Sequence, residues 1–180
     1  AKATADLYAI QPPTHPKVTY SASVTGGGTS VNAIPSKVFT EYDMRSADAA
    51  ELAKLDARFK EIMAEAVAHE NASRSTRVGA VKVEIEPIGD RPAGQTPKDA
   101  PIVAYTAAAI QALGYVPTYE ASSTDANAPM AAGVPAITIG GGGKGGRAHS
   151  LDEWVDMEKA GGVKGMSVGL AAILAMAGVD

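Results

Sequence analysis

Two stretches near the start of the chain alternate apolar and polar residues with the period of a half-buried β-strand. The first covers residues 18–24 and the second covers residues 38–44. The alternation predicts an inward face of Val18, Tyr20, Ala22 and Val24 in the first and of Val38, Thr40, Tyr42 and Met44 in the second. The opposite face of the second strand carries Phe39, Glu41, Asp43 and Arg45. Residues 26–35 connect the two strands by a loop longer than an ordinary hairpin loop, and long loops on a rigid sheet often carry function.

A helical period follows from Ala47 to about His69. Its apolar face is formed by Leu52, Leu55, Phe59, Ile62, Met63 and Ala66. Ser46 or Asp48 is a candidate N-cap, and Asp48 has capping-box spacing to Glu51. The pattern therefore predicts a long amphipathic helix directly after the second strand.

Two shorter elements complete the first half. Residues 1–10 are predicted to be the tail of a helix that ends before Pro12 and Pro13. A third strand is predicted at Val81, Val83 and Ile85, where apolar residues again alternate. Three strands with a helix packed on one face make a small α+β unit.

The second half differs in kind from the first. Residues 89–97 are polar and rich in proline and glycine, which is typical of a linker. Thr96 with Pro97 is predicted to begin a helix that continues to Leu113 and ends at Gly114.

Residues 134–139 are a short apolar run without alternation, as in a strand that is covered on both faces. Residues 166–176 are predicted to form a terminal helix. Together with the helix before them, these elements predict an α/β layer.

Composition limits the classes of function. Of the 180 residues, 46% are hydrophobic and 20% charged, which is ordinary for a soluble globular protein. The net charge of −4 provides no basic surface for a phosphate backbone, so we expect no nucleic-acid partner. No uninterrupted run reaches the roughly 18 apolar residues of a membrane span, so we expect no membrane partner. The absence of cysteine excludes disulfides and thiolate zinc sites, and it is compatible with a reducing, cytoplasmic location.

A glycine-rich segment, residues 140–146, follows the predicted strand at 134–139. Gly141, Gly143 and Gly146 fit the GxGxxG spacing of a nucleotide-binding loop. Against that function, Lys144 is followed by glycine rather than by the Ser or Thr of a P-loop, and no helix is predicted directly after the glycines. The bare backbone N–H groups could instead receive a ligand that carries a carboxylate.

His149 is the strongest candidate for chemistry. It lies just past the end of the predicted strand, where open α/β sheets bind their ligands. Imidazole is a common zinc ligand, and Asp152 or Glu153 could orient it. A zinc site needs three or four ligands, and neither His15 nor His69 is placed to supply one.

Two polar segments are weaker candidates. Residues 122–127, which include Thr124, are typical of a capped turn but could form a polar wall facing the same strand ends as His149. Asp43 and Arg45 share one strand face, which is common on solvent-exposed strands. An arginine is nevertheless the usual receptor for a substrate carboxylate.

Taken together, these segments resemble the M20 family of zinc metallopeptidases and deacylases. The family includes dipeptidases, aminoacylases, acetylornithine deacetylase and succinyl-diaminopimelate desuccinylase. The resembling stretches are residues 27–35, 43–46, 123–127 and 140–154, which follow the family's order over most of the chain.

The resemblance implies an incomplete α+β lid in residues 1–92, with an antiparallel sheet and helices. The C-terminal part of an α/β zinc-peptidase catalytic domain follows in residues 96–180. It further implies a homodimer through the lid and a substrate that is a small peptide or an N-acyl amino acid.

The same resemblance implies functions for individual residues. His149 corresponds to a ligand of a two-zinc centre, and Asn32 and Arg45 correspond to substrate contacts from the lid. Thr124 and the glycine loop, with Gly141 and Gly142, correspond to the substrate pocket.

The sequence departs from the family because its H-x-D ligand pair, bridging Asp and Glu-Glu pair are missing. The chain also begins without Met, so we expect these residues to lie before its first residue. We therefore expect no stably bound zinc and no amidase activity in this chain alone. A non-catalytic dimerisation module is the alternative.

Overall fold

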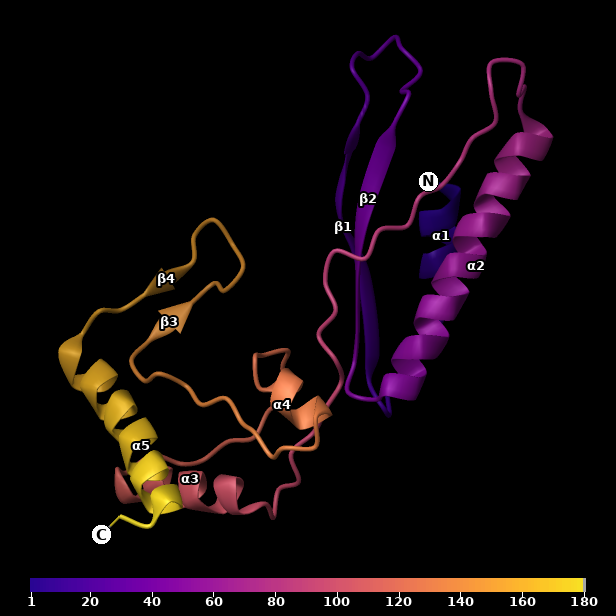
Figure 1. Cartoon of the computed structure of the whole chain (residues 1–180). Helices are drawn as coiled ribbons and strands as arrows, with labels where there is room; N and C mark the ends of the chain where they lie inside the picture. The colour runs from indigo at the N-terminus through magenta and orange to yellow at the C-terminus, as the bar shows by residue number, and fades with distance from the viewer. Residues whose placement is uncertain (180) are drawn as a thin grey trace. The chain divides into compact units, whose positions relative to one another are not determined.

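The two alternating stretches form an antiparallel hairpin of β1 (Val18–Gly27) and β2 (Val38–Ser46) in the computed structural model, which describes residues 1–179 (Figure 1). The register shifts between Ala22 and Val24, so a bulge interrupts the pairing. Before the bulge the predicted inward positions are shielded, because Val18 is buried and Tyr20 is half-buried. Beyond the bulge, Val24 and Val38 are exposed. The predicted alternation therefore corresponds to burial only in the half of the hairpin that helices cover.

Helices α1 (Lys2–Tyr8) and α2 (Ala49–Ser73) pack against this hairpin within a first unit, residues 1–93. Its core consists of Leu7, Val18, Leu55, Phe59, Ile62 and Met63, flanked by Tyr20, Tyr42 and Met44. The rings of Tyr42 and Phe59 lie 5.0 Å apart between centroids, which joins the sheet to α2. The predicted helix and both strands are thus confirmed as one amphipathic arrangement with the core between its layers.

The N-cap of α2 is Asp48, as predicted. Its carboxylate accepts hydrogen bonds from the backbone N–H groups of Ala50 at 2.9 Å and Glu51 at 3.0 Å. The reciprocal half of a capping box is missing, because the Glu51 carboxylate pairs with Lys54. The N–H of Asp48 donates instead to the Ser46 hydroxyl. Both candidate residues therefore contribute to the start of the helix.

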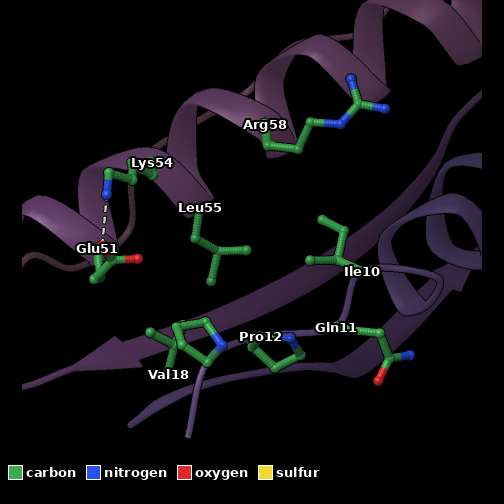
Figure 2. A pocket seen from close by; sticks show the side chains of 9 residues that line it. Ile10, Gln11, Pro12, Val18, Glu51, Lys54, Leu55 and Arg58 are labelled. Carbon is green, nitrogen blue, oxygen red and sulfur yellow. Dashed lines mark hydrogen bonds and ion pairs between the residues drawn. The ribbon is translucent and has the colours of Figure 1, made fainter. Parts of the chain in front are cut away.

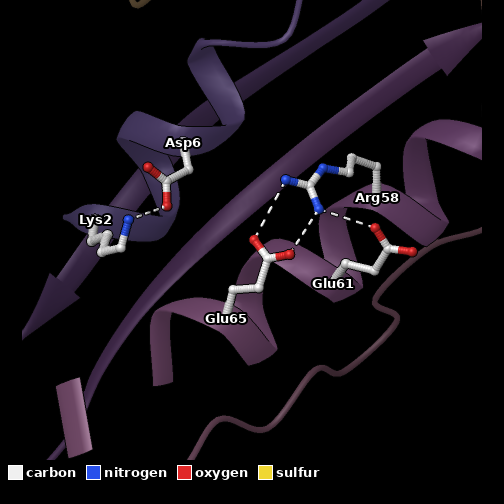
Figure 3. A network of polar contacts seen from close by, with 5 residues as sticks. All are labelled: Lys2, Asp6, Arg58, Glu61 and Glu65. Carbon is white, nitrogen blue, oxygen red and sulfur yellow. Dashed lines mark hydrogen bonds and ion pairs between the residues drawn. The ribbon is translucent and has the colours of Figure 1, made fainter. Parts of the chain in front are cut away.

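Ion pairs cover the solvent face of α2 (Figure 3). The guanidinium of Arg58 donates to Glu61 at 3.0 Å and to Glu65 at 3.1 Å. Lys2 and Asp6 form a similar pair on α1. These side chains are largely exposed, so each pair contributes only about 0–1 kcal/mol to stability.

The predicted strand at residues 81–85 is wrong, because these residues pair with no strand. Val81 and Val83 are 51% and 43% exposed. The Asn71 side chain bonds both backbone groups of Val81, accepting from its N–H at 2.8 Å and donating to its carbonyl at 3.0 Å. At Val81, one amide side chain thus occupies the backbone groups that a neighbouring strand would use.

The second unit begins at Gly94 and contains helices α3 (Pro101–Ala112), α4 (Asn127–Ala131) and α5 (Lys159–Ala177). Helices α3 and α5 pack together (Figure 1). The buried residues of the two helices are Val103, Thr106 and Ala109 in α3 and Gly165, Val168 and Ala172 in α5. A short hairpin of β3 (Gly145–Gly146) and β4 (Trp154–Val155) precedes α5.

The predicted boundaries of both packed helices need correction. Helix α3 begins at Pro101 rather than at Thr96. The proline favoured at the first position of a helix is therefore Pro101 and not Pro97. Helix α5 begins seven residues before the predicted Met166, capped by the Glu158 carboxylate. Glycines at its N-terminal end obscured the helical pattern because glycine is a poor helix former.

The predicted buried strand at residues 134–139 is also wrong. Val134 is 55% exposed and Ile139 is 37% exposed, and no strand pairs with this segment. The Thr96 hydroxyl accepts from the N–H of Ala136 at 2.9 Å and donates to the carbonyl of the same residue. The second unit is therefore a helix pair with a small hairpin rather than an α/β layer, and the described chain as a whole is α+β.

Helix α5 is long and apolar enough to cross a membrane, judged by length and composition alone. The core helix of a soluble protein passes the same test when it is mostly buried, whereas 17% of the apolar window of α5 is buried. Here α5 packs against α3, and its glycine-bearing face contacts residues 139–143.

Candidate functional site

The candidate residues of the second unit lie along one continuous path. The segment 139–143 runs beside α5, and the chain then forms β3, turns through residues 147–153 and returns as β4. In this hairpin Gly145 pairs with Val155, and the N–H of Asp156 donates to the Lys144 carbonyl at 2.8 Å. His149 therefore lies in the turn of a hairpin that is joined directly to the glycine loop.

The turn that carries His149 is defined by its own hydrogen bonds. The Ser150 hydroxyl donates to the Arg147 carbonyl at 2.8 Å, and the Arg147 guanidinium pairs with Asp152 at 3.1 Å. Both Arg147 and His149 have a left-handed backbone, with φ of 57° and 65°. The left-handed conformation costs about 1–2 kcal/mol for residues other than glycine. Such strain is concentrated at functional sites, so it supports a role for this turn.

Two predictions about the surroundings of His149 are wrong. His149 does not follow a buried strand, since residues 134–139 form none. The predicted orienting acceptors do not bind its imidazole either: Asp152 pairs with Arg147, and Glu153 accepts the backbone N–H of His149 at 3.2 Å. The carboxylates therefore fix the backbone of the turn and leave the exposed imidazole free of hydrogen bonds within residues 1–179.

Thr124 contacts the segment that leads into the glycine loop. The Thr138 hydroxyl donates to the Thr124 hydroxyl at 2.8 Å, and Thr138 precedes Gly140 by two residues. The N–H of Thr124 donates to the Asn127 side chain at 2.9 Å, as expected for a capped turn. The structure thus brings Thr124 to the start of the loop.

Asn32 and Arg45 lie in the first unit and are far apart there. Asn32 is in the exposed loop between β1 and β2, where its side chain accepts from the Ser30 hydroxyl. Arg45 pairs across the hairpin with Thr19, near the other end. At about 3.3 Å per residue, the stretch from Val38 to Arg45 alone spans about 23 Å. The two side chains therefore cannot contact one small ligand together.

Arg45 is already engaged by a carboxylate. Its guanidinium lies 2.6 Å from Asp43, and this hydrogen bond raises the pKa of Arg45 above its ordinary value. A substrate carboxylate would have to compete with Asp43 for the same donors.

Among the described residues, a hollow lies in the first unit and another in the second. The hollow of the first unit, about 160 Å³, is lined mainly by Ile10, Pro12, Val18 and Leu55 (Figure 2). Its charged neighbours are paired, Lys54 with Glu51 and Arg58 with Glu61 and Glu65. No predicted site residue lines it, so it is not a candidate site.

The hollow of the second unit measures about 250 Å³ and borders the glycine loop. Its lining residues are Tyr115, Gly143, Lys144, Asp156, Glu158 and Gly161. The Lys164 ammonium lies 4.3 Å from the centroid of the Tyr115 ring, and Glu158 caps α5. Gly143 and Lys144 belong to the glycine-rich segment that the sequence singled out, whereas Glu158 and Gly161 were missed because α5 was predicted to begin only at residue 166.

Glu158 makes the start of α5 sensitive to acid. The backbone N–H groups of Gly161 and Ala160 donate to its carboxylate and lower its pKa below the ordinary value of 4.5. A lowered pKa in the folded state means that this stabilisation is present above about pH 4.5 and is lost as the pH falls through the folded-state pKa.

We therefore expect Glu158→Gln to lower the thermal midpoint at neutral pH and to flatten its dependence on pH below about 4.5. Thermal unfolding followed by circular dichroism at a series of pH values measures this. Glu120→Gln, at an exposed position outside any helix of the same unit, is the control. A Glu158→Gln profile that runs parallel to that of the unaltered chain into acid would contradict the prediction.

The residues present do not complete a metal centre. Residues 1–179 contain no group of three or more His, Asp or Glu side chains placed to share a metal ion. Protein zinc sites use three or four such ligands. His149 can therefore supply one ligand, and the described chain supplies no others beside it.

The glycine loop is not built as a nucleotide-binding loop. After Gly146 the chain continues as the hairpin β3–β4, and α5 begins only at Lys159. A phosphate loop requires a helix N-terminus directly after its glycines.

Comparison with known protein families assigns the chain. The model of peptidase family M20/M25/M40 matches residues 5–175. The chain thus belongs to the M20/M25/M40 family of peptidases, and the resemblance seen in its sequence is confirmed at that level. A search of curated proteins finds no match. Family membership indicates a peptidase, which is a hydrolase.

Proposed function

We propose that this chain is part of a zinc-dependent hydrolase that cleaves amide bonds of small peptides or N-acyl amino acids. His149 is one ligand of its metal centre. The observation that carries the proposal is the placement of His149 in a strained, hydrogen-bonded turn that leaves its imidazole exposed. Membership of the peptidase family supplies the class of reaction.

In this proposal the remaining metal ligands and the general base lie outside these 180 residues. One imidazole holds zinc too weakly to retain an ion at micromolar concentration, because protein sites derive their affinity from several ligands.

The substrate lies, in this proposal, beside the glycine loop and the Thr124 hydroxyl. Gly141 and Gly142 offer backbone N–H groups to a polar group of the substrate, and Thr124 is held at the start of the loop by Thr138. Asn32 and Arg45 would act from the first unit at separate points, since the hairpin holds them apart.

A homodimer through the first unit is a further part of the proposal. Within residues 1–179, β1 and β2 pair only with each other, so each strand has an outer edge that pairs with no other strand. Such an edge can pair with a second chain.

The 180-residue chain itself is predicted to bind no stoichiometric zinc at micromolar metal and to have no amidase activity. Isothermal titration with zinc measures the first, and hydrolysis of a dipeptide panel measures the second. A tight site for one or two zinc ions in this chain would contradict the prediction.

The full-length protein tests the proposed function. We expect it to hydrolyse members of a panel of dipeptides and N-acyl amino acids, to lose this activity to a chelator and to regain it with zinc. Activity that survives complete removal of zinc would exclude the zinc-dependent function. Inactivity of the zinc-loaded protein on the whole panel would exclude the proposed substrate class.

A further inference from the structure

Helix α5 carries glycine at every fourth position over two steps, and these glycines form one stripe along the helix. The stripe consists of Gly161, Gly165 and Gly169. Each of these glycines contacts the segment 139–143, and the two run in opposite directions, so that the first glycine of the stripe meets the last residue of the segment. A Cβ built on Gly161 would lie 3.2 Å from the Gly143 Cα, and one built on Gly169 would lie 3.3 Å from the Ile139 side chain.

The middle of the stripe makes the closest contact. A Cβ at Gly165 would overlap the carbonyl of Gly141 and the backbone of Gly142. The fit is mutual, because a Cβ at Gly142 would lie 2.6 Å from the Gly161 carbonyl and 2.6 Å from the Gly165 Cα. Gly142 also has φ of 78°, a conformation that side chains disfavour. Backbone therefore packs directly on backbone here.

The contacts follow the stripe along the helix. The eight helical steps from Gly161 to Gly169 rise about 12 Å, at about 1.5 Å per residue. Over this length Gly161 meets Gly143, Gly165 meets Gly141 and Gly142, and Gly169 meets the Ile139 side chain. The segment thus contacts three successive glycines of the stripe, which a single accidental contact would not do.

We propose that Gly165 is a positioning residue: through the glycine stripe, α5 sets where the backbone of Gly141 and Gly142 lies, and so orients the loop toward its ligand. This rests on the proposed function, in which that loop lines the substrate pocket. The hairpin with His149 starts directly after the loop, so the same contact fixes the point from which it extends.

The test compares Gly165→Ala with Gly162→Ala in the full-length protein. The control position is on the same helix, but a Cβ at Gly162 would meet nothing within 4 Å. Both variants gain the same methyl group and the same helix propensity, so they differ only in the contact with the loop. Amide hydrogen exchange of residues 142–146 reports the loop, and KM and kcat report its use.

We expect exchange in residues 142–146 to accelerate about tenfold or more in Gly165→Ala, as for other overpacked contacts, with α3 and the C-terminal half of α5 unchanged. KM should rise by about the same factor with a smaller change in kcat. Gly162→Ala should match the unaltered protein. Gly169→Ala, where the added methyl meets only the end of the Ile139 side chain, should give a smaller effect in the same direction. If Gly165→Ala fails to fold, Gly169→Ala still tests whether the glycine stripe positions the loop.

Unchanged loop exchange in Gly165→Ala, or an equal rise throughout α3 and α5, would overturn the inference. An unchanged KM in an active Gly165→Ala enzyme would overturn the claim that Gly165 orients the loop toward its ligand. If the unaltered protein hydrolyses no substrate, the proposed function fails, while the exchange measurement still decides whether Gly165 positions the loop.

Discussion

Replacing His149 with alanine in the full-length protein is expected to lower kcat/KM for amide hydrolysis by at least about 100-fold. Loss of a residue that only orients a metal ligand already costs about 10–100-fold in metal affinity or activity, so loss of a ligand should cost no less. The zinc content of the purified variant should fall as well, which elemental analysis measures alongside the kinetics.

The fold should tolerate this change. His149 is exposed, and its imidazole makes no hydrogen bond within residues 1–179. The bonds of the turn come from other side chains and from the His149 backbone N–H, which alanine keeps. His69→Ala, at an exposed position on α2, is the matched control and should keep both zinc and activity. Full activity and full zinc content in His149→Ala would show that His149 is not a ligand of the metal centre.

Replacing Ile62 with alanine is expected to destabilise the first unit by about 2–5 kcal/mol. Ile62 is fully buried between α2 and the hairpin, in contact with a core of only a few large side chains. Truncation removes apolar contacts and leaves a cavity that so small a core cannot easily fill. Urea unfolding followed by far-ultraviolet circular dichroism measures the loss, because α2 is the longest helix in the described residues.

Ile34→Ala is the matched control for the core. Ile34 lies in the loop between β1 and β2 and is 98% exposed, so the same truncation should change stability by less than about 0.5 kcal/mol. Equal effects of the two substitutions would mean that the packing of α2 on the hairpin does not limit the stability of this unit.

The elements that could be predicted from the sequence are those whose pattern is local and long. The alternation in residues 18–24 and 38–44 and the helical period after Asp48 each repeat over several turns or pairs, and all three elements form. The two predicted strands that do not form had shorter patterns: three alternating apolar residues at 81–85 and a six-residue apolar run without alternation at 134–139. In the folded chain the Asn71 side chain bonds the backbone of Val81 and the Thr96 hydroxyl bonds that of Ala136, and the local pattern predicts neither contact.

The candidate site shows the same division. His149 and the glycine loop stand out by residue type and order, and the family match agrees with the resemblance that they carry. The left-handed backbone of His149 can be seen only in the folded turn. The same holds for Glu153 as the acceptor of the His149 backbone N–H. The fourfold spacing of Gly161, Gly165 and Gly169 was a readable signal, but its meaning depends on the segment that packs against it.

The most direct test of the central claim is a crystal structure of the full-length protein with anomalous scattering recorded at the zinc edge. The account predicts a zinc peak about 2.0–2.1 Å from an imidazole nitrogen of His149, with its other ligands from residues outside this chain. Zinc bound elsewhere, with the His149 imidazole still free in solvent, would contradict it.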